Sequence, residues 1–186
     1  TCALPISEAV HQGFALLAEP LPKVYLEDII SLTKSKTRAT ILVLDRITDP
    51  HSVGAIMRSA SVFGADAVII SDRHAPTLNG TLAKSSSGAV ETLPLVRVTN
   101  LVRAIRSLQK QGFWCVGLDS DADIPLEDQK PALHQVIALG AEDRGLRRLT
   151  REACDAICKI SSSGPIRSLN VSNAAAVALF SLNRLQ

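Results

Sequence analysis

Three polar segments hold most of the side chains with which this 186-residue chain could do chemistry. The first, residues 45–58, has the sequence DRITDPHSVGAIMR and follows a short apolar run. Ser52 is expected to cap a helix that begins near Val53. Arg58 would then stand about one and a half turns into that helix, either as a binding residue or only as a surface arginine.

The second segment, residues 136–148, has the sequence VIALGAEDRGLRR. A strand is expected to run into Gly140, and a tight loop then carries Glu142. Four arginines stand against two acidic residues between Ala141 and Arg151. Strand ends followed by glycine are where α/β folds bind ligands, although a solvated turn with surface arginines would have the same composition.

The third segment, residues 159–173, has the sequence KISSSGPIRSLNVSN. Seven hydroxyl or amide side chains fall between Ser161 and Asn173. A loop this polar beside an apolar helix must satisfy many buried groups or bind something. The alternative is structural, with Ser172 or Asn173 capping the last helix.

Short apolar runs bounded by glycine, aspartate or serine mark the elements that must position these segments. Such runs are typical of strands buried on both faces of a parallel sheet. The expected strands are residues 41–44, 67–70, 95–98, 113–118, 136–139 and 156–160. Helical patterns lie at residues 53–63, 75–83, 100–111, 146–153 and 173–182. This alternation predicts an α/β fold with a mostly parallel sheet flanked by helices. The last helix is apolar nearly all round, which predicts burial, with a subunit interface as one place for it.

Composition and missing motifs exclude several classes of protein. The chain is 46% hydrophobic and 20% charged, with a net charge of +2, which fits one α/β domain with a modest appendage. It contains no G-x-G-x-x-G after the first strand, no P-loop motif and no zinc-deaminase motif. No apolar run approaches the ~18 residues of a membrane span. The four cysteines lack C-x-x-C spacing, which favours free thiols in a reducing cytosol over a metal site.

The order and spacing of the three segments resemble the motifs of the SpoU-type RNA ribose 2′-O-methyltransferases, within the SPOUT superfamily. The matching stretches are DPHSVGAIMR at residues 49–58, LGAE with GL at residues 139–146, and SLNVS at residues 168–172. Residues 83–89 also resemble a family segment, and the resemblance covers roughly residues 39–184. The chain departs from the family at Ser52, where asparagine is usual, and at Ser161-Ser162, where Pro-Met is usual. Asp143-Arg144 also replaces a more common small residue.

The resemblance implies a deep C-terminal trefoil knot, in which the chain after residue 160 is threaded through an earlier loop. It also implies a homodimer, with residues 173–182 in the interface. The implied cofactor is S-adenosylmethionine, held bent in the knot. The residues that match its binding loops are Gly117, Leu118, Leu139, Gly140, Ile160, Ser168 and Leu169.

The implied reaction is methyl transfer from a sulfonium to a ribose 2′-oxygen of RNA. The leaving group needs neither an acid nor a metal. The difficult part is the activation of the ribose hydroxyl, which is a poor nucleophile. The family assigns its activation to the arginine that matches Arg58. Because arginine keeps its proton above pH ~12, a phosphate or carboxylate could take the proton, or Arg58 could stabilise the developing alkoxide. Ser168 and Asn170 would position Arg58 and the ribose, and Glu142 would hold Asn170 or the substrate.

RNA contacts are expected from Ser52, Arg58, Arg144 and Arg147. A basic helix face formed by Arg103, Arg106 and Lys110 is a further candidate, although a solvated helix face is the favoured interpretation of these residues. Aromatic residues make up only 3% of the chain, so base stacking is not expected from this domain.

Residues 1–38 look unlike the rest and are expected to be the remnant of an upstream domain plus a linker that contains Pro20 and Pro22. VHQGF at residues 10–14 resembles the junction in family members that carry an L30e-like RNA-binding domain. The methyltransferase domain would then be residues 39–186. Such members mostly modify a guanosine of large-subunit ribosomal RNA, which is the predicted substrate. Transfer RNA and a non-catalytic knotted RNA-binding protein are the alternatives, and no membrane or metal is expected.

Overall fold

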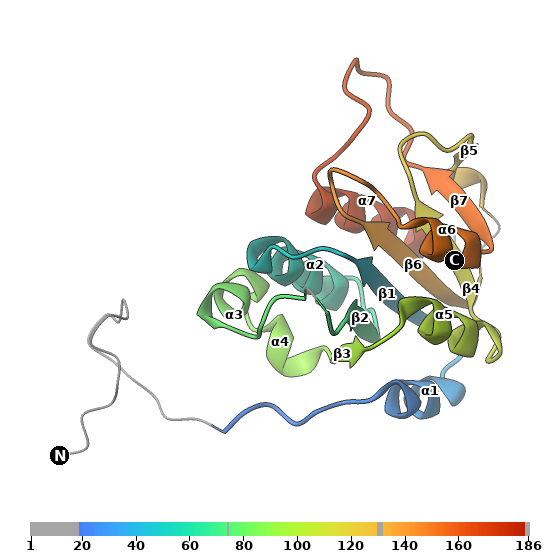
Figure 1. Cartoon of the computed structure of the whole chain (residues 1–186). Coiled ribbons are helices and arrows are strands. Elements are labelled where there is room, and N and C mark those ends of the chain that lie inside the picture. The colour runs from blue at the N-terminus through green and yellow to red at the C-terminus, as the bar shows by residue number, and fades with distance from the viewer. Residues whose placement is uncertain (1–18, 74, 130–131, 185–186) are drawn as a thin grey trace.

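The computed structural model describes residues 19–73, 75–129 and 132–184 (Figure 1). Its seven-stranded sheet has the order β3-β2-β1-β6-β4-β7-β5, and every pairing between named strands is parallel. The strands are β1 Ala39–Asp45, β2 Ala67–Ser71, β3 Leu95–Val98, β4 Trp114–Leu118, β5 Ile124–Pro125, β6 His134–Gly140 and β7 Ala156–Lys159. The predicted α/β class with a mostly parallel sheet is confirmed.

Helices cover both faces of this sheet (Figure 1). They are α1 Leu26–Lys34, α2 Pro50–Val62, α3 Gly80–Ser86, α4 Ala89–Thr92, α5 Leu101–Gln109, α6 Arg148–Ala153 and α7 Val171–Arg184, with a short 3-10 helix η1 Leu126–Asp128. Helices α2, α3, α4 and α7 pack into one apolar core, and α1, α5 and α6 pack into the other. All seven residues of β1 are buried, because its alternate side chains enter the two cores. That double burial explains its uninterrupted apolar run.

Strand register brings the three polar segments to one edge of the sheet. Asp45, the last residue of β1, lies opposite Gly140, the last residue of β6. On the other side of β6, β4 pairs with both β6 and β7. The chain runs outward from β1 to β3 and then returns to the far side of β6. This reversal of strand order is where open α/β sheets form a ligand crevice beyond the carboxyl ends of their strands.

Helix α2 begins three residues earlier than the sequence pattern suggested. Asp49 is its N-cap, since its carboxylate accepts hydrogen bonds from the backbone N–H groups of His51 and Ser52. The prediction that Ser52 caps this helix is therefore wrong. Pro50 occupies the first helical position, where a missing N–H costs nothing.

Two other helix boundaries also differ from prediction. Helix α3 begins at Gly80 rather than at residue 75, because the carboxamide of Asn79 accepts from Leu82 N and sets the start there. Helix α7 begins directly after Asn170, whose side chain accepts from Ser172 N. Ser172 therefore lies inside the helix and does not cap it.

Helix α1 was not expected in the segment before residue 39. Ile29 is buried, and Leu26 and Ile30 pack against the same core as β1 and β2. Residues 19–25 form neither helix nor strand. The resemblance at residues 10–14 lies outside the described residues, so the assignment of residues 1–38 to an upstream domain stays a prediction, as does the knot.

The apolar helix α7 is only partly covered. It buries Ala175, Ala178 and Leu179 but leaves Phe180 49% exposed. The Phe180 ring meets Phe63, the C-cap residue of α2, edge-on, with the ring centres 6.2 Å apart. Within the described ranges, no helix is long and apolar enough to cross a membrane.

Candidate active site

A cavity of about 640 Å³ opens where β4, β6 and β7 end. The loops after these strands and the start of α7 form its walls. Six of the seven residues predicted to bind the cofactor line it, namely Leu118, Leu139, Gly140, Ile160, Ser168 and Leu169. Gly117 is the exception, since it lies one residue deeper in β4. A Cβ atom there would come within 2.7 Å of Leu146 Cδ1, so Gly117 lets the strand pack closely.

Gly140 makes the tight turn at the end of β6 possible. A Cβ atom at this position would lie 2.0 Å from the carbonyl carbon of Gly145 and 2.2 Å from Leu146 N. The loop folds back on itself, with Gly145 N donating to the carbonyl oxygen of Ala141 at 2.7 Å. Gly145 has a φ of 62°, a conformation that suits glycine. The turn projects Glu142 toward the cavity, which Glu142 also lines.

Glu142 joins the second and third polar segments. Its Oε1 atom accepts a hydrogen bond from Asn170 Nδ2 at 2.6 Å and a longer one from Val171 N at 3.3 Å. The other end of the Asn170 amide accepts from Ser172, from the backbone N–H at 3.0 Å and from the hydroxyl at 2.6 Å. Both ends of this side-chain amide are therefore occupied, which fixes its orientation.

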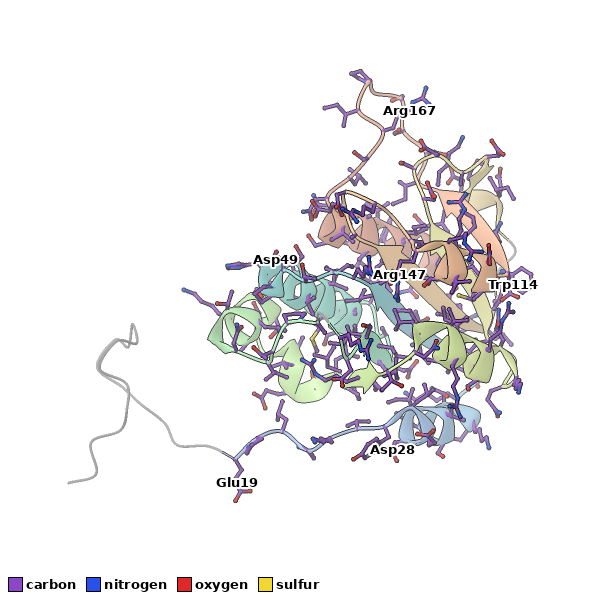
Figure 2. All side chains as sticks on the ribbon, in the orientation of Figure 1. Glu19, Asp28, Asp49, Trp114, Arg147 and Arg167 are labelled. Atoms are coloured by element: carbon purple, nitrogen blue, oxygen red, sulfur yellow. The ribbon has the colours of Figure 1, made fainter. Side chains whose placement is uncertain are left out.

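Asp45 joins the first and second segments. This fully buried carboxylate accepts from Arg147 N at 3.0 Å and from Arg147 Nε at 2.6 Å. The Arg147 side chain remains 43% exposed and lies beside the end of β1, where Asp45 stands (Figure 2). Two bonds from one residue to a buried acceptor hold the segment after Gly145 in place. The predicted contact of Arg147 with RNA stays a prediction.

Arg58 is exposed on α2 and does not line the cavity. Its side chain makes no hydrogen bond or ion pair with another residue that the structure describes. Helix α2 nevertheless packs closely against α3, since a Cβ atom on Gly54 would lie 1.9 Å from Ser85 Oγ of α3. A single chain therefore brings Glu142, Ser168 and Asn170 together and leaves Arg58 apart from them.

Ser52 makes a hydrogen bond to the N-cap residue of α2 in this structure. Its hydroxyl donates to Asp49 Oδ2 at 2.7 Å. This hydrogen bond is the main cause of a lowered pKa at Asp49, with the two backbone N–H groups adding to it. The contact of Ser52 with RNA stays a prediction, as does that of Arg144, which lines the cavity.

Sequence reasoning missed several residues of the cavity. Asp119 lines it directly after β4 and forms an ion pair with Arg151 of α6. Ser161 and Ser162, noted from the sequence only as a departure from the family pattern, line it as well, and a hydrogen bond from the Ser161 side chain lowers the pKa of Glu127. A polar residue directly after a buried strand, such as Asp119, is the signal that could have found this site. The loop between β7 and α7 extends away from the body, with Arg167 on it (Figure 2).

The described cysteines form no disulfide. Cys115 and Cys154 lie with their sulfur atoms 3.7 Å apart, and Cys115 donates to Cys154. This hydrogen bond lowers the pKa of the Cys154 thiol, whereas burial raises that of Cys158 to about 11. Among the described residues, no group of three or more His, Cys, Asp or Glu side chains is placed to hold a metal ion.

This parallel sheet has a crevice beyond its strand ends, at the place where the strand order reverses, and polar loops line that crevice. This is the architecture of the open α/β domains that bind a small ligand at such a reversal. Residues 39–180 match the SpoU rRNA Methylase family, and the chain belongs to this family. The resemblance inferred from the three segments is confirmed.

Named relatives support this membership. The chain is 42% identical over 172 residues to the 23S rRNA (guanosine-2′-O-)-methyltransferase RlmB of Escherichia coli K12, covering 92% of this chain and 71% of that protein. The RlmB protein of Vibrio vulnificus is also 42% identical, over 173 residues.

Solved structures agree on the fold. The SpoU methyltransferase AviRb from Streptomyces viridochromogenes, in complex with AdoMet, superposes with a TM-score of 0.74 at 28% identity, over 80% of this chain. An AdoMet-bound rRNA methyltransferase from Sinorhizobium meliloti gives 0.76 at 25% identity, over 88% of this chain. The chain spans 58% and 61% of these two solved chains, so it corresponds to less than two thirds of each.

Proposed function

We propose that this chain transfers a methyl group from S-adenosylmethionine to the ribose 2′-hydroxyl of a guanosine in 23S ribosomal RNA. The observation that carries the proposal is the cavity at the strand ends, lined by the motif residues of a SpoU-family domain. The named RNA and nucleoside come from the RlmB relatives at 42% identity. Ribosomal RNA would place the protein in the cytoplasm.

The cavity suits the cofactor in size and lining. Its volume of about 640 Å³ lies within the range of small-molecule sites. Leu118, Leu139 and Leu169 offer apolar surface, and the strand-end loops offer backbone polar groups. S-adenosylmethionine supplies a methyl group on a positively charged sulfur, so the protein needs to bind and orient it and to exclude water.

The acceptor is the demanding partner, because a ribose hydroxyl is a poor nucleophile. Arg58 is proposed to donate hydrogen bonds to the 2′-oxygen as negative charge develops there, while the proton leaves to a phosphate, carboxylate or water. Asn170, held by Glu142, and Ser168 would position the ribose. Alignment of the methyl group with the oxygen can supply much of the rate.

A homodimer is proposed because the site is incomplete within one chain. Arg58 lies apart from the cavity, and α2 and α7 carry exposed apolar side chains that a partner could cover. Val62 is 74% exposed and Phe180 is 49% exposed. A partner subunit packed against these helices would bury both side chains and could bring its own Arg58 to the cavity.

Transfer RNA is the second candidate substrate. The solved tRNA-modifying relatives are only 19% and 20% identical to this chain, which supports the shared fold and not the substrate. A non-catalytic role rests on Ser52 alone.

Isothermal titration of the purified chain with S-adenosylmethionine tests the cofactor. We expect saturable binding with a stoichiometry of one per chain. An absence of heat at millimolar cofactor would overturn this part of the proposal.

A further inference from the structure

A second cavity, of about 600 Å³, lies beside the cofactor cavity. It is formed by the loop between β1 and α2 and by the segment from β6 to α6. The polar side chains that line it are Arg46, Thr48, Asp143, Arg144, Arg147 and Arg148. Asp143 and Arg144 line both cavities, so the two adjoin along the loop that carries Glu142.

The guanidinium groups of this second cavity differ in how they are held. Arg147 is fixed by the buried carboxylate of Asp45. Arg144 pairs with Asp143 and Arg148 pairs with Glu152, but all four of these side chains are more than half exposed. Exposed ion pairs contribute little to stability, so an incoming anion can displace either carboxylate from its arginine at little cost.

Among the four arginines that line this cavity, Arg46 alone has no partner within the described residues. Its side chain makes no hydrogen bond or ion pair with another residue in the part of the chain that the structure describes. Its backbone has a φ of 60°, the left-handed region that non-glycine residues rarely adopt. A long basic side chain at such a position, directly after the buried Asp45, points to a function for that side chain.

We propose that this second cavity binds a phosphodiester of the substrate RNA, with Arg46 as its main ligand. Guanidinium groups match phosphate oxygens in charge and in planar geometry. A phosphate held here would run the RNA backbone past the loop that separates the two cavities, with a neighbouring ribose toward the methyl donor. This inference rests on the proposed function, because it takes RNA as the substrate.

The test compares RNA binding by the wild-type chain, Arg46→Gly and Arg46→Lys over a range of salt concentrations. Glycine suits the backbone at this position, so Arg46→Gly removes the guanidinium without adding strain. The probe is unmodified 23S ribosomal RNA made by transcription, and the matched control is Lys34→Ala at the end of α1, which precedes the start of β1 and lies away from the two cavities (Figure 1).

Loss of one phosphate contact should weaken RNA binding several-fold and reduce the slope of log affinity against log salt by about 0.7–0.9. Arg46→Lys should keep most of the slope, and Lys34→Ala should match the wild type. Cofactor affinity should be the same in all four proteins. An unchanged slope and affinity in Arg46→Gly would overturn the inference, as would a loss of inorganic phosphate binding without any change toward RNA.

Failure of the proposed function would look different. In that case the wild-type chain itself would bind no cofactor or transfer no methyl group, whatever the behaviour of Arg46→Gly.

Discussion

The carboxylate of Glu142 accepts a hydrogen bond from Asn170 at 2.6 Å, across 28 residues of sequence, and so ties the loop after β6 to the start of α7. Glu142 lines the cofactor cavity, whereas Asn170 stands between the lining residues Leu169 and Val171 and caps α7. The relationship makes Glu142 a positioning residue, whose effect on catalysis should pass through the orientation of the Asn170 amide.

Glu142→Ala should slow methyl transfer about tenfold, the lower end of the range for a lost hydrogen bond to a charged group, because both partners are exposed. Glu142→Gln keeps an acceptor oxygen and should recover part of the rate. Initial rates with labelled S-adenosylmethionine measure both variants. Equal rates for Glu142→Ala and the wild type would contradict a positioning role.

Gly140→Ala should abolish or strongly weaken cofactor binding, because the added Cβ would collide with the backbone of Gly145 and Leu146 and displace the loop. Gly80→Ala is the matched control, since nothing lies within 4 Å of a Cβ atom there. Calorimetry should show normal cofactor affinity for Gly80→Ala. Normal affinity for Gly140→Ala as well would show that this loop does not shape the cofactor site.

Asp45→Asn should lower the free energy of unfolding by about 2 kcal/mol. This is less than the ~3–5 kcal/mol expected for breaking a fully buried pair, because the Arg147 side chain is 43% exposed. Urea denaturation measures the change. Arg148→Ala breaks only an exposed pair and should change stability by less than about 0.5 kcal/mol. Similar losses in the two variants would argue against Asp45 as the anchor of this segment.

Arg58→Ala should abolish methyl transfer while leaving the fold and cofactor affinity unchanged, since its side chain is exposed and makes no hydrogen bond or ion pair with another described residue. A mixing experiment can locate its action. Arg58→Ala is combined with a chain that carries both Glu142→Ala and Asn170→Ala, and each protein alone is expected to show little or no activity.

If Arg58 acts across the dimer, random exchange should restore about a quarter of wild-type activity, because half of the dimers then contain one intact site out of two. No recovery, despite heterodimers seen by native mass spectrometry, would place Arg58 in its own chain's site.

Much of the sheet could be predicted because its strands are buried on both faces, which leaves continuous apolar runs. The bounds expected for β3, residues 95–98, agree with the structure. Helix α1 could not be found this way, since Ile29 and Leu26 pack against strands that follow later in the chain. The start of α2 was misplaced because Asp49 and Ser52 are both good capping residues, and only the structure shows which side chain accepts the backbone bonds.

The candidate site was predicted unevenly for a similar reason. Residues such as Gly140, at the end of β6, and Leu169, in the loop before α7, follow from the order of motifs along the chain. Partners that are distant in sequence do not. Arg147 and Asp45 are 102 residues apart, and nothing in the local sequence of either names the other. The basic residues near Gly145 therefore suggested RNA contacts, whereas the structure also gives Arg147 a role in holding the loop.

The most direct test of the proposed function is methyl transfer to a defined nucleoside. The purified chain is incubated with labelled S-adenosylmethionine and unmodified 23S ribosomal RNA, and the RNA is digested and analysed by mass spectrometry. The proposed function predicts label in 2′-O-methylguanosine, and none with Arg58→Ala. Label on a base, or no label in an otherwise folded and cofactor-bound protein, would contradict it.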